Sequence, residues 1–413
     1  MTDEIRAFQN PFKPGAGHMP PFLAGRKDEE QQFRRLLAQS EILENLVLTG
    51  LRGVGKTVLL ETFKPIALSE RWLWAGTDMS EIASVSETNL ATRILTDLAV
   101  VTSAFTVKIG TRSDAGFGTS EEAILQPVNF AYLARLYENT PGLVTDKLKT
   151  VMEFAWSLLS QTDKKGIIFA YDEAQNLSDN DEKEQFPLSV LLDVFQSIQR
   201  RGIPFMLALT GLPTLFPKLV EARTFAERMF RVVSLGKLSF DDSKLAITKP
   251  VEDAACPIEF SDESVDLIAH LSAGYPYFIQ FICREVYDVW LQRLSTNSGM
   301  EIPVEEITRK LDTDFFAGRW AKATDRQRDL MWVISLLANC DEEFTVQEIV
   351  TKSQDLLNKS FNSSHVNQML SALSKSGIVY KNRHGKYMFA VPLMADFVRR
   401  QSDTGSSSES LDA

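Results

Sequence analysis

The sequence predicts an α/β fold in which a parallel sheet is covered by helices on both faces. Over residues 27–236, five short apolar runs of strand length alternate with helical stretches. Such alternation favours parallel strands joined by crossover helices. After residue 236 the pattern becomes mainly helical. The predicted strands are 45–49, 72–75, 167–171, 205–210 and 232–235.

A glycine-rich motif directly follows the first predicted strand. Residues 50–57 read Gly-Leu-Arg-Gly-Val-Gly-Lys-Thr, the pattern G-x-x-x-x-G-K-[ST]. In this pattern backbone N–H groups point at phosphate oxygens, the lysine contacts the outer phosphates, and the threonine hydroxyl binds Mg²⁺. A helix is expected next, ending at Pro65. The motif therefore predicts a nucleoside triphosphate site, with contacts from Gly50, Leu51, Arg52, Gly53, Val54, Gly55, Lys56, Thr57 and Val58.

A pair of carboxylates ends the third predicted strand. Asp172 and Glu173 directly follow the apolar run 167–171. Because the carboxyl ends of parallel strands meet at one sheet edge, Asp172 is predicted to share Mg²⁺ with Thr57. Glu173 is the candidate to orient and polarise the attacking water. Thr210 ends the next strand and is a candidate contact for this water or the γ-phosphate, with capping of the following turn as the alternative.

A positive charge is also needed to offset the charge that develops on the transferred phosphate. Arg223, Arg228 and Arg231 lie close together in the sequence. We expect Arg228 to act as an arginine finger in a neighbouring subunit's site, which predicts a homo-oligomer in the ATP state. The alternative is a solvated helix face with an Arg–Glu pair.

Residues 324–400 predict three helices followed by a β-hairpin, which is a winged-helix arrangement. Capping boxes start the first two helices, at Thr324 and Thr345. The hairpin turn is basic, and such a wing would contact the phosphate backbone of duplex DNA. The alternative is a winged helix that contacts only proteins. The candidate DNA contacts are Lys381, Arg383 and Lys386.

Composition narrows the class of protein. The net charge of −11 argues against an overall basic nucleic-acid-binding surface, although a local basic patch is compatible with it. No apolar run approaches the ~20 residues that span a bilayer, and no secretion signal starts the sequence. The cysteines, Cys256, Cys283 and Cys340, are too dispersed for a zinc or disulfide pattern. We therefore expect a cytoplasmic protein without a membrane partner.

Taken together, these features resemble the AAA+ ATPases of the origin-recognition and replication-initiator type, with relatives in the STAND and archaeal-type groups. The resemblance implies that Leu23 and Arg26 line an adenine pocket and that a helical lid covers bound ATP or ADP. Initiators of this type carry an arginine at the start of a lid helix, where this chain has Gly274-Tyr275-Pro276. This segment is similar to the Gly-x-Pro segment of STAND ATPases, so Pro276 is a candidate nucleotide contact. The segments that carry the resemblance are 21–26, 50–57, 171–175, 209–213, 273–276 and the C-terminal hairpin.

The resemblance also implies a domain order and a function. The expected function is a Mg²⁺-dependent ATPase that acts as a switch and assembles on or remodels DNA. The alternatives are a STAND-type signalling ATPase whose winged helix makes regulatory protein contacts, and a nucleotide-binding scaffold without turnover. The expected parts are an extended arm (1–26), an AAA+ base domain (27–236) with an insertion or long loop at about 104–129, a helical lid (237–323), a winged helix (324–400) and a disordered tail (401–413).

Overall fold

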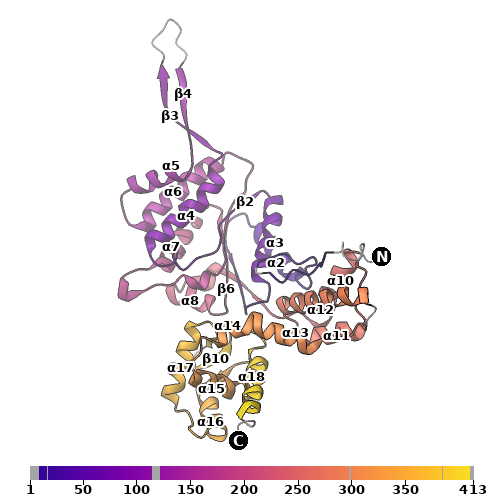
Figure 1. Ribbon diagram of the computed structural model, residues 1–413. Coiled ribbons are helices and arrows are strands. Elements are labelled where there is room, and N and C mark those ends of the chain that lie inside the picture. The colour runs from indigo at the N-terminus through magenta and orange to yellow at the C-terminus, as the bar shows by residue number, and fades with distance from the viewer. Residues whose placement is uncertain (1–8, 16, 114–120, 297–298, 384, 410–413) are drawn as a thin grey trace. The chain divides into compact units, whose positions relative to one another are not determined.

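The computed structural model describes residues 9–15, 17–113, 121–296, 299–383 and 385–409 of the 413-residue chain. The chain divides into two compact units, which are described separately (Figure 1). The sheet unit consists of Lys27–Thr49 and Leu59–Ser234. The loop unit consists of Met1–Arg26, Gly50–Val58 and Leu235–Ala413.

A five-stranded sheet in the order β2-β5-β6-β1-β7 forms the centre of the sheet unit (Figure 1). The β2–β5, β5–β6 and β6–β1 pairs are parallel. Every residue of β5 and β6 is buried, because helices cover both faces, and this explains their almost continuous apolar sequences. All five predicted strands are confirmed, with ends shifted by one or two residues at most. They are β1 (Asn45–Gly50), β2 (Trp72–Ala75), β5 (Gly166–Tyr171), β6 (Phe205–Gly211) and β7 (Phe230–Leu235).

Helices pack on the two faces of this sheet. Helices α4, α6 and α7 lie on one face and α2 and α3 on the other (Figure 1). On the second face, the ring of Phe33 stacks on that of Phe63 at 4.2 Å, and Trp74 packs edge-on against Phe33. The helical elements are α2 (Lys27–Leu37), α3 (Lys56–Ser69), α4 (Glu87–Thr102), α5 (Phe130–Asn139), α6 (Val144–Leu159), η1 (Ala174–Asn176), η2 (Asp181–Lys183), α7 (Pro187–Gln199), α8 (Leu215–Ala222) and α9 (Ala226–Met229).

The expectation that Pro65 ends the helix after the phosphate loop is wrong. Pro65 lies inside α3, which continues to Ser69. Proline removes a single N–H donor from the helix. On both sides of it, Phe63, Ile66 and Ala67 are buried, and this packing compensates for the missing backbone hydrogen bond.

The segment expected to be an insertion or long loop at 104–129 is instead largely a β-hairpin. Strands β3 (Thr106–Ser113) and β4 (Glu121–Pro127) pair in antiparallel fashion and project from the helices of the sheet unit (Figure 1). The register shifts between Lys108 and Gly110, so this glycine marks a strand irregularity. This glycine suggested a loop, because the strand that pairs with β3 lies too far along the chain for a local reading of the sequence to detect. Residues 114–120 lie outside the described residues.

The loop unit has one hydrophobic core that extends through the segments predicted as lid and winged helix. Phe316 stacks on Phe397 at 4.9 Å, across the predicted boundary at residue 324. Ser261 caps α11, and α12 begins at Pro276. The elements before this boundary are α10 (Phe240–Asp253), α11 (Asp262–Leu271), α12 (Pro276–Thr296), α13 (Val304–Leu311), the π-helix η3 (Asp312–Phe316) and α14 (Ala317–Trp320).

The C-terminal part of the loop unit contains the expected helices and hairpin. Both capping boxes are confirmed, at Thr324 and Thr345. A short strand, β8, adds to the hairpin and gives an antiparallel sheet in the order β8-β10-β9. The elements are α15 (Asp325–Ser335), β8 (Phe344–Thr345), α16 (Val346–Leu356), α17 (Ser363–Lys375), β9 (Val379–Arg383), β10 (Lys386–Phe389) and α18 (Met394–Glu409).

Helix α18 extends to Glu409, into the segment that the sequence predicts to be a disordered tail, and that disorder stays a prediction. The buried Met394, Phe397 and Val398 fix the first turns of α18, from which a helix can propagate. Residues 410–413 lie outside the described part of the chain. The arm is extended, but Phe12 is only 2% exposed and belongs to the core of the loop unit, against Phe260.

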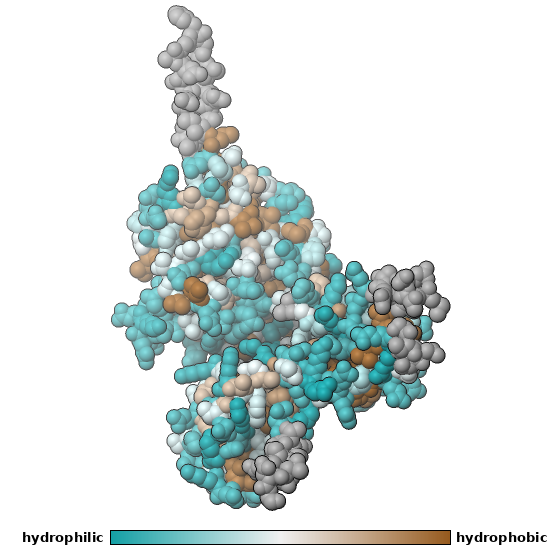
Figure 2. All heavy atoms as spheres, in the orientation of Figure 1, coloured by the Kyte–Doolittle hydropathy of each residue, from teal (hydrophilic) through white to brown (hydrophobic). Residues whose placement is uncertain are grey.

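The surface face in Figure 2 is mostly hydrophilic, with hydrophobic side chains scattered over it. No helix within the described residues is both long and apolar enough to cross a membrane. Two of the three cysteines, Cys283 and Cys340, are buried as expected, and Cys256 is partly buried.

Candidate functional site

The side chain of Lys56 binds to the backbone of the phosphate loop in which it lies. The Nζ of Lys56 donates to the carbonyl oxygens of Gly50 and Leu51, each at 2.9 Å. Gly53 and Gly55 have φ values of 81° and 90°, in the left-handed region that favours glycine. A Cβ at Gly55 would meet nothing within 4 Å, so the loop surface is open at this position. These features fit a backbone cradle for phosphate groups.

Arg26 supports the loop from the preceding segment. Its side chain is 6% exposed, and Nη2 donates to the carbonyl oxygens of Val54 at 3.0 Å and Gly236 at 2.9 Å. Sequence reasoning assigned Arg26 and Leu23 to an adenine pocket. Leu23 is partly buried, and its role there stays a prediction. The adenine contact of Arg26 also stays a prediction, and its two observed bonds hold the loop conformation.

The first turn of α12 contacts the loop through a residue that sequence reasoning missed. The backbone N–H of Tyr277 donates to the carbonyl oxygen of Gly53 at 3.1 Å. The Tyr277 ring packs against that of Phe315 at 5.0 Å. Pro276 begins this helix, but the observed contact belongs to the next residue. Free N–H groups in a first helical turn would have signalled this possibility.

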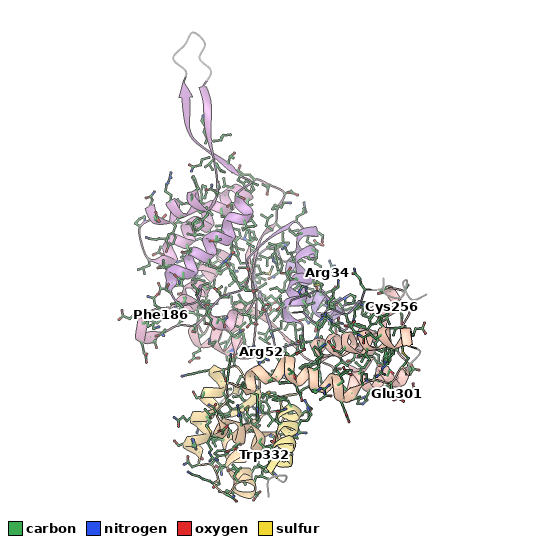
Figure 3. All side chains as sticks on the ribbon, in the orientation of Figure 1. Arg34, Arg52, Phe186, Cys256, Glu301 and Trp332 are labelled. Atoms are coloured by element: carbon green, nitrogen blue, oxygen red, sulfur yellow. The ribbon has the colours of Figure 1, made fainter. Side chains whose placement is uncertain are left out.

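Arg52 extends from the loop towards the C-terminal part of the same unit (labelled in Figure 3). A Cβ on Gly377, which has a φ of 69°, would lie 3.2 Å from Nη2 of Arg52. Arg319 is close enough that its pKa is lowered, first by burial and then by the charge of Arg52. Arg319 also packs over the ring of Phe315 at 4.8 Å. Among the described residues Arg52 has no ion pair, so two neighbouring cations lie beside the phosphate loop.

The acidic pair is held at the carboxyl ends of β5 and β6. Asp172 is 5% exposed, and its Oδ1 accepts hydrogen bonds from the hydroxyl of Thr210 and from the backbone N–H of Glu173, the latter at 2.7 Å. Thr210 is fully buried. Its predicted contact with water or the γ-phosphate stays untested, whereas its bond to Asp172 gives it a positioning role that the sequence did not indicate.

Glu173 presents an exposed side chain from a strained backbone. Its φ is 51°, which is uncommon for a residue other than glycine. The Nε2 of Gln175 donates to Oε2 of Glu173. The Oε1 of Gln175 accepts from the backbone N–H of Leu212 at 3.1 Å. Sequence reasoning included Gln175 only in a motif and gave it no role.

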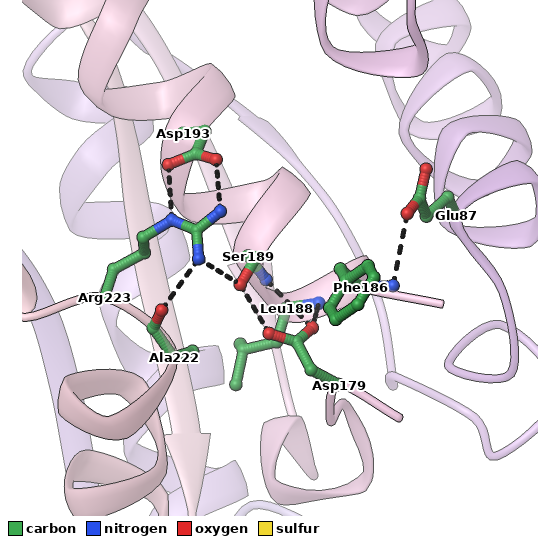
Figure 4. Close-up of polar contacts among 8 residues, drawn as sticks. All are labelled: Glu87, Asp179, Phe186, Leu188, Ser189, Asp193, Ala222 and Arg223. Carbon is green, nitrogen blue, oxygen red and sulfur yellow. Dashed lines mark hydrogen bonds and ion pairs between the residues drawn. The ribbon is translucent and has the colours of Figure 1, made fainter. Parts of the chain in front are cut away.

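Two of the three clustered arginines are engaged within the sheet unit. Arg223 makes two bonds to the Asp193 carboxylate, at 2.8 and 2.7 Å, and one to Ser189 (Figure 4). Arg231 forms an exposed ion pair. Arg228, on α9, is exposed and has no ion pair within the described residues. Its assignment as an arginine finger remains a prediction.

The positive charge of the β9–β10 hairpin, the predicted wing, is partly neutralised by an acidic side chain. Nε of Arg383 donates to both carboxylate oxygens of Glu343, at 3.0 and 2.8 Å, and Asn382 donates to the same group at 2.7 Å. The hydrogen bonds from Arg383 and then Asn382 lower the pKa of Glu343. Lys381 is exposed, Lys386 is partly buried, and neither has an ion pair among the described residues. The three predicted DNA contacts are therefore not equivalent.

Mg²⁺ fits a site with few protein ligands. Within the described residues, no group of three or more His, Cys, Asp or Glu side chains could hold a metal ion. Mg²⁺ usually keeps several waters and binds through one or two protein groups plus substrate phosphates. The hydroxyl of Thr57 and the carboxylate of Asp172 are donors of the kind that Mg²⁺ prefers, and their shared use by one ion stays a prediction.

Comparison with known proteins identifies the fold. A family profile described as a domain of unknown function (DUF8462) matches residues 313–398. No curated protein matches the chain. A Walker-type ATPase of Pyrococcus abyssi is similar in structure, with a TM-score of 0.56 at 14% identity, covering 91% of this chain and 96% of that one.

The ADP form of the ORC2 protein of Aeropyrum pernix has a TM-score of 0.53 at 14% identity, covering 95% of this chain and 99% of that one. Its ADPNP–ADP form has a TM-score of 0.51 at 13% identity, covering 95% and 98%. At this identity the likeness establishes the fold alone. The α/β sheet of this chain, with its helical regions, therefore matches the AAA+ P-loop fold of these structures.

Proposed function

We propose that the chain binds and hydrolyses ATP with Mg²⁺ and works as a nucleotide-dependent switch on duplex DNA. The observation that carries the ATPase proposal is the buried hydrogen bond from Thr210 to Asp172. In the sheet register, Thr210 pairs with Leu48 of β1. Along the chain, the phosphate loop follows β1 and the acidic pair follows β5, so each comes directly after the carboxyl end of a strand of this sheet.

Each polar group then has a distinct task in hydrolysis. Lys56 and the loop N–H groups bind the phosphates, and Glu173 orients water for attack. The water oxygen bonds to the γ-phosphorus, the bond to the β,γ-bridging oxygen breaks, and the released water proton passes to Glu173 or to the phosphate product. Bound Mg²⁺, held by Thr57 and Asp172, would neutralise the negative charge of the phosphates. The products are ADP and inorganic phosphate.

Glu173→Gln tests the ATPase proposal. It should abolish phosphate release while ATP, detected by filter retention of labelled nucleotide, stays bound. The matched control is Glu182→Gln, at an exposed glutamate of η2, which should behave like the wild type. Unchanged turnover in Glu173→Gln would refute the water-orienting role. Absence of ATP binding by the wild type would refute the whole proposal.

The DNA proposal is supported by charge and exposure in the C-terminal part. Lys381 and Lys386 lack ion pairs among the described residues, and Ser364, Asn367 and Gln368 are exposed near the start of α17. A helix start and a basic wing are the groups through which such folds contact duplex DNA. Exposure of these side chains leaves them available for phosphate or base contacts.

Titrations of the protein with duplex DNA, in the presence of ATP or of ADP, test the DNA proposal. Lys381→Ala should weaken binding and reduce the dependence of log affinity on log salt by about 1. Arg383→Ala should have a smaller effect, since Glu343 already neutralises Arg383. Lys322→Ala, at an exposed position outside the wing, is the control. Equal DNA binding by all variants, or DNA binding that does not depend on the bound nucleotide, would refute the DNA proposal.

A second candidate is a STAND-type signalling switch whose C-terminal part makes regulatory contacts. The specific observation in its favour is the approach of Arg52 to Gly377, which brings the turn after α17 to the phosphate loop. In this alternative, the C-terminal part stays on the loop while ADP is bound and leaves it when a partner protein binds.

Two glycine substitutions distinguish this candidate. Gly377→Ala introduces a Cβ against Arg52, whereas Gly385→Ala meets nothing within 4 Å. Both residues have similar positive φ values, 69° and 73°, so backbone strain is matched. The switch predicts faster ADP release in Gly377→Ala only, measured by stopped-flow fluorescence of a labelled ADP. Equal release rates in the two variants would argue against it.

A further inference from the structure

We propose that Gln175 is a positioning residue that fixes the Glu173 carboxylate relative to the end of β6. The proposal rests on the ATPase function proposed above and names a further residue of the same site. Gln175 lies in the short turn η1, directly after the acidic pair. Its amide joins the side chain of Glu173 to the backbone of Leu212, which follows β6.

The two contacts determine the orientation of the amide. The backbone N–H of Leu212 can only donate, so it must face Oε1 of Gln175. An ionised Glu173 can only accept, so it must face Nε2. Glutamine has a donor and an acceptor on one planar group, and both are used here. A glutamate at this position would lose the donor and place a second negative charge beside Glu173.

The surroundings leave Gln175 little freedom. A Cβ on Gly211 would lie 2.5 Å from Oε1 of Gln175, so the absence of a side chain at Gly211 makes room for the amide. Nζ of Lys218 donates to the Gln175 carbonyl oxygen at 2.7 Å and holds the backbone of the turn. Burial lowers the pKa of Lys218. The backbone and the end of the side chain are thus held by separate groups.

The amide is not needed to hold the turn itself. The neighbouring Asn176 donates from Nδ2 to the carbonyl oxygen of Met79 at 3.0 Å, which anchors η1 independently. Glu173, by contrast, is exposed and leaves the strand with a left-handed backbone. Without the Gln175 bond its side chain would be free to take several rotamers. The bond to Gln175 therefore acts mainly on the direction of the Glu173 carboxylate.

The arrangement ties both acids to the same neighbouring strand. Thr210 of β6 binds Asp172, and Gln175 connects Glu173 to Leu212. A displacement at the end of β6 would reach both carboxylates together.

The test measures steady-state ATP hydrolysis over a range of ATP concentrations. Gln175→Ala should lower kcat on the order of 10- to 100-fold, because misplacement of a reacting group by about 1 Å has an effect of that size. The KM for ATP should change little. Asn176→Ala, which loosens the same turn without touching Glu173, should keep the wild-type kcat and KM. An equal loss in both variants would reduce Gln175 to a structural role and overturn the proposal.

Two further variants separate positioning from general damage. In a Glu173→Asp background, which keeps a carboxylate too short to reach Gln175, Gln175→Ala should lower the residual kcat much less than it does in the wild type, because Gln175 acts only through Glu173. Gly211→Ala should reproduce the Gln175→Ala phenotype by displacing the amide. Additive effects, or wild-type kcat in Gln175→Ala, would overturn the inference while leaving the ATPase proposal intact. A wild-type protein that binds ATP without hydrolysing it would instead overturn both.

Discussion

The acidic pair that follows β5 is held by hydrogen bonds within one unit, whereas the phosphate loop is held by groups from separate segments of the other. Asp172 is buried and receives its bonds from nearby strand and turn residues. The loop carbonyls instead receive donors from Arg26, before the sheet begins, and from Tyr277, at the start of α12. In the C-terminal part, a Cβ on Gly377 would lie 3.2 Å from Nη2 of the loop residue Arg52.

The difference indicates two kinds of preorganisation. The acidic pair has its hydrogen-bond donors supplied by the fold, which suits groups that must keep a fixed geometry during chemistry. Beside the loop, Arg52 and Arg319 place like charges close together, and an anion would reduce their repulsion. We therefore expect substitutions at the acidic pair to affect turnover, and those around the loop to affect nucleotide affinity.

The largest effect is expected for Lys56→Ala. This change removes the cation of the loop and both of its bonds to loop carbonyls. Nucleotide affinity should fall on the order of 100-fold, since hydrogen bonds to charged groups are worth about 1.5–3 kcal/mol each. Titration with a fluorescent ATP analogue measures it. Lys64→Ala, on the exposed side of α3, controls for lost charge and helix context; comparable affinities in the two variants would contradict the loop assignment.

Thr210→Val should affect turnover more than binding. The change keeps the side-chain shape but leaves Asp172 without a hydroxyl donor. We expect a loss of about 1–3 kcal/mol in the free energy of unfolding, measured with urea, together with a roughly tenfold lower kcat. Thr49→Val removes another buried hydroxyl, which pairs with Ser234 at 3.3 Å and does not contact Asp172. If Thr49→Val lowers kcat equally, Thr210 has no special role.

Arg26→Ala tests whether the loop depends on support from outside the sheet unit. Loss of the two bonds to the Val54 and Gly236 carbonyls should weaken nucleotide affinity by about tenfold with little change in kcat. Arg35→Ala, at an exposed position of α2, is the control. Isothermal titration with ATP and with ADP measures the affinity. A lower kcat with unchanged affinity would contradict the expectation that substitutions around the loop affect nucleotide affinity.

Sequence reasoning succeeded where the signal was local. The strand ends and the capping boxes at Thr324 and Thr345 depend on neighbouring residues. It failed where distant packing decides the outcome. Pro65 remains inside a helix because flanking side chains are buried, and Phe12 joins a core formed more than 200 residues later.

The candidate site shows the same limit. The motif identified the phosphate loop and the acidic pair, because their spacing is fixed by the chemistry. The bond from Gln175 to Leu212 joins residues 37 positions apart, and the approach of Arg52 to Gly377 joins residues much farther apart still. Neither pair has a sequence pattern of its own, since each depends on how strands and helices meet.

The smallest effect is expected for Arg383→Gln, at an exposed ion pair in the C-terminal part. The hydrogen bond from Arg383 lowers the pKa of Glu343 in the folded chain, so the pair stabilises the fold above the unfolded-state pKa and loses that contribution as pH falls through the folded pKa. Arg383→Gln should raise the pKa of Glu343 and flatten this acid-side dependence. Carboxyl NMR titration and urea unfolding at several pH values measure both effects.

Because exposed ion pairs contribute little, Arg383→Gln should destabilise the fold less than Thr210→Val does at neutral pH. The two bonds differ mainly in burial: Asp172 is 5% exposed, whereas Glu343 and Arg383 lie in contact with solvent. The conservative Arg383→Lys should restore part of the pKa shift, since it keeps the charge and loses the fork geometry. If Arg383→Gln lowers the free energy of unfolding more than Thr210→Val does, burial does not explain why the hydrogen bond to Asp172 matters more. The fixed geometry of the acidic pair would then need another explanation.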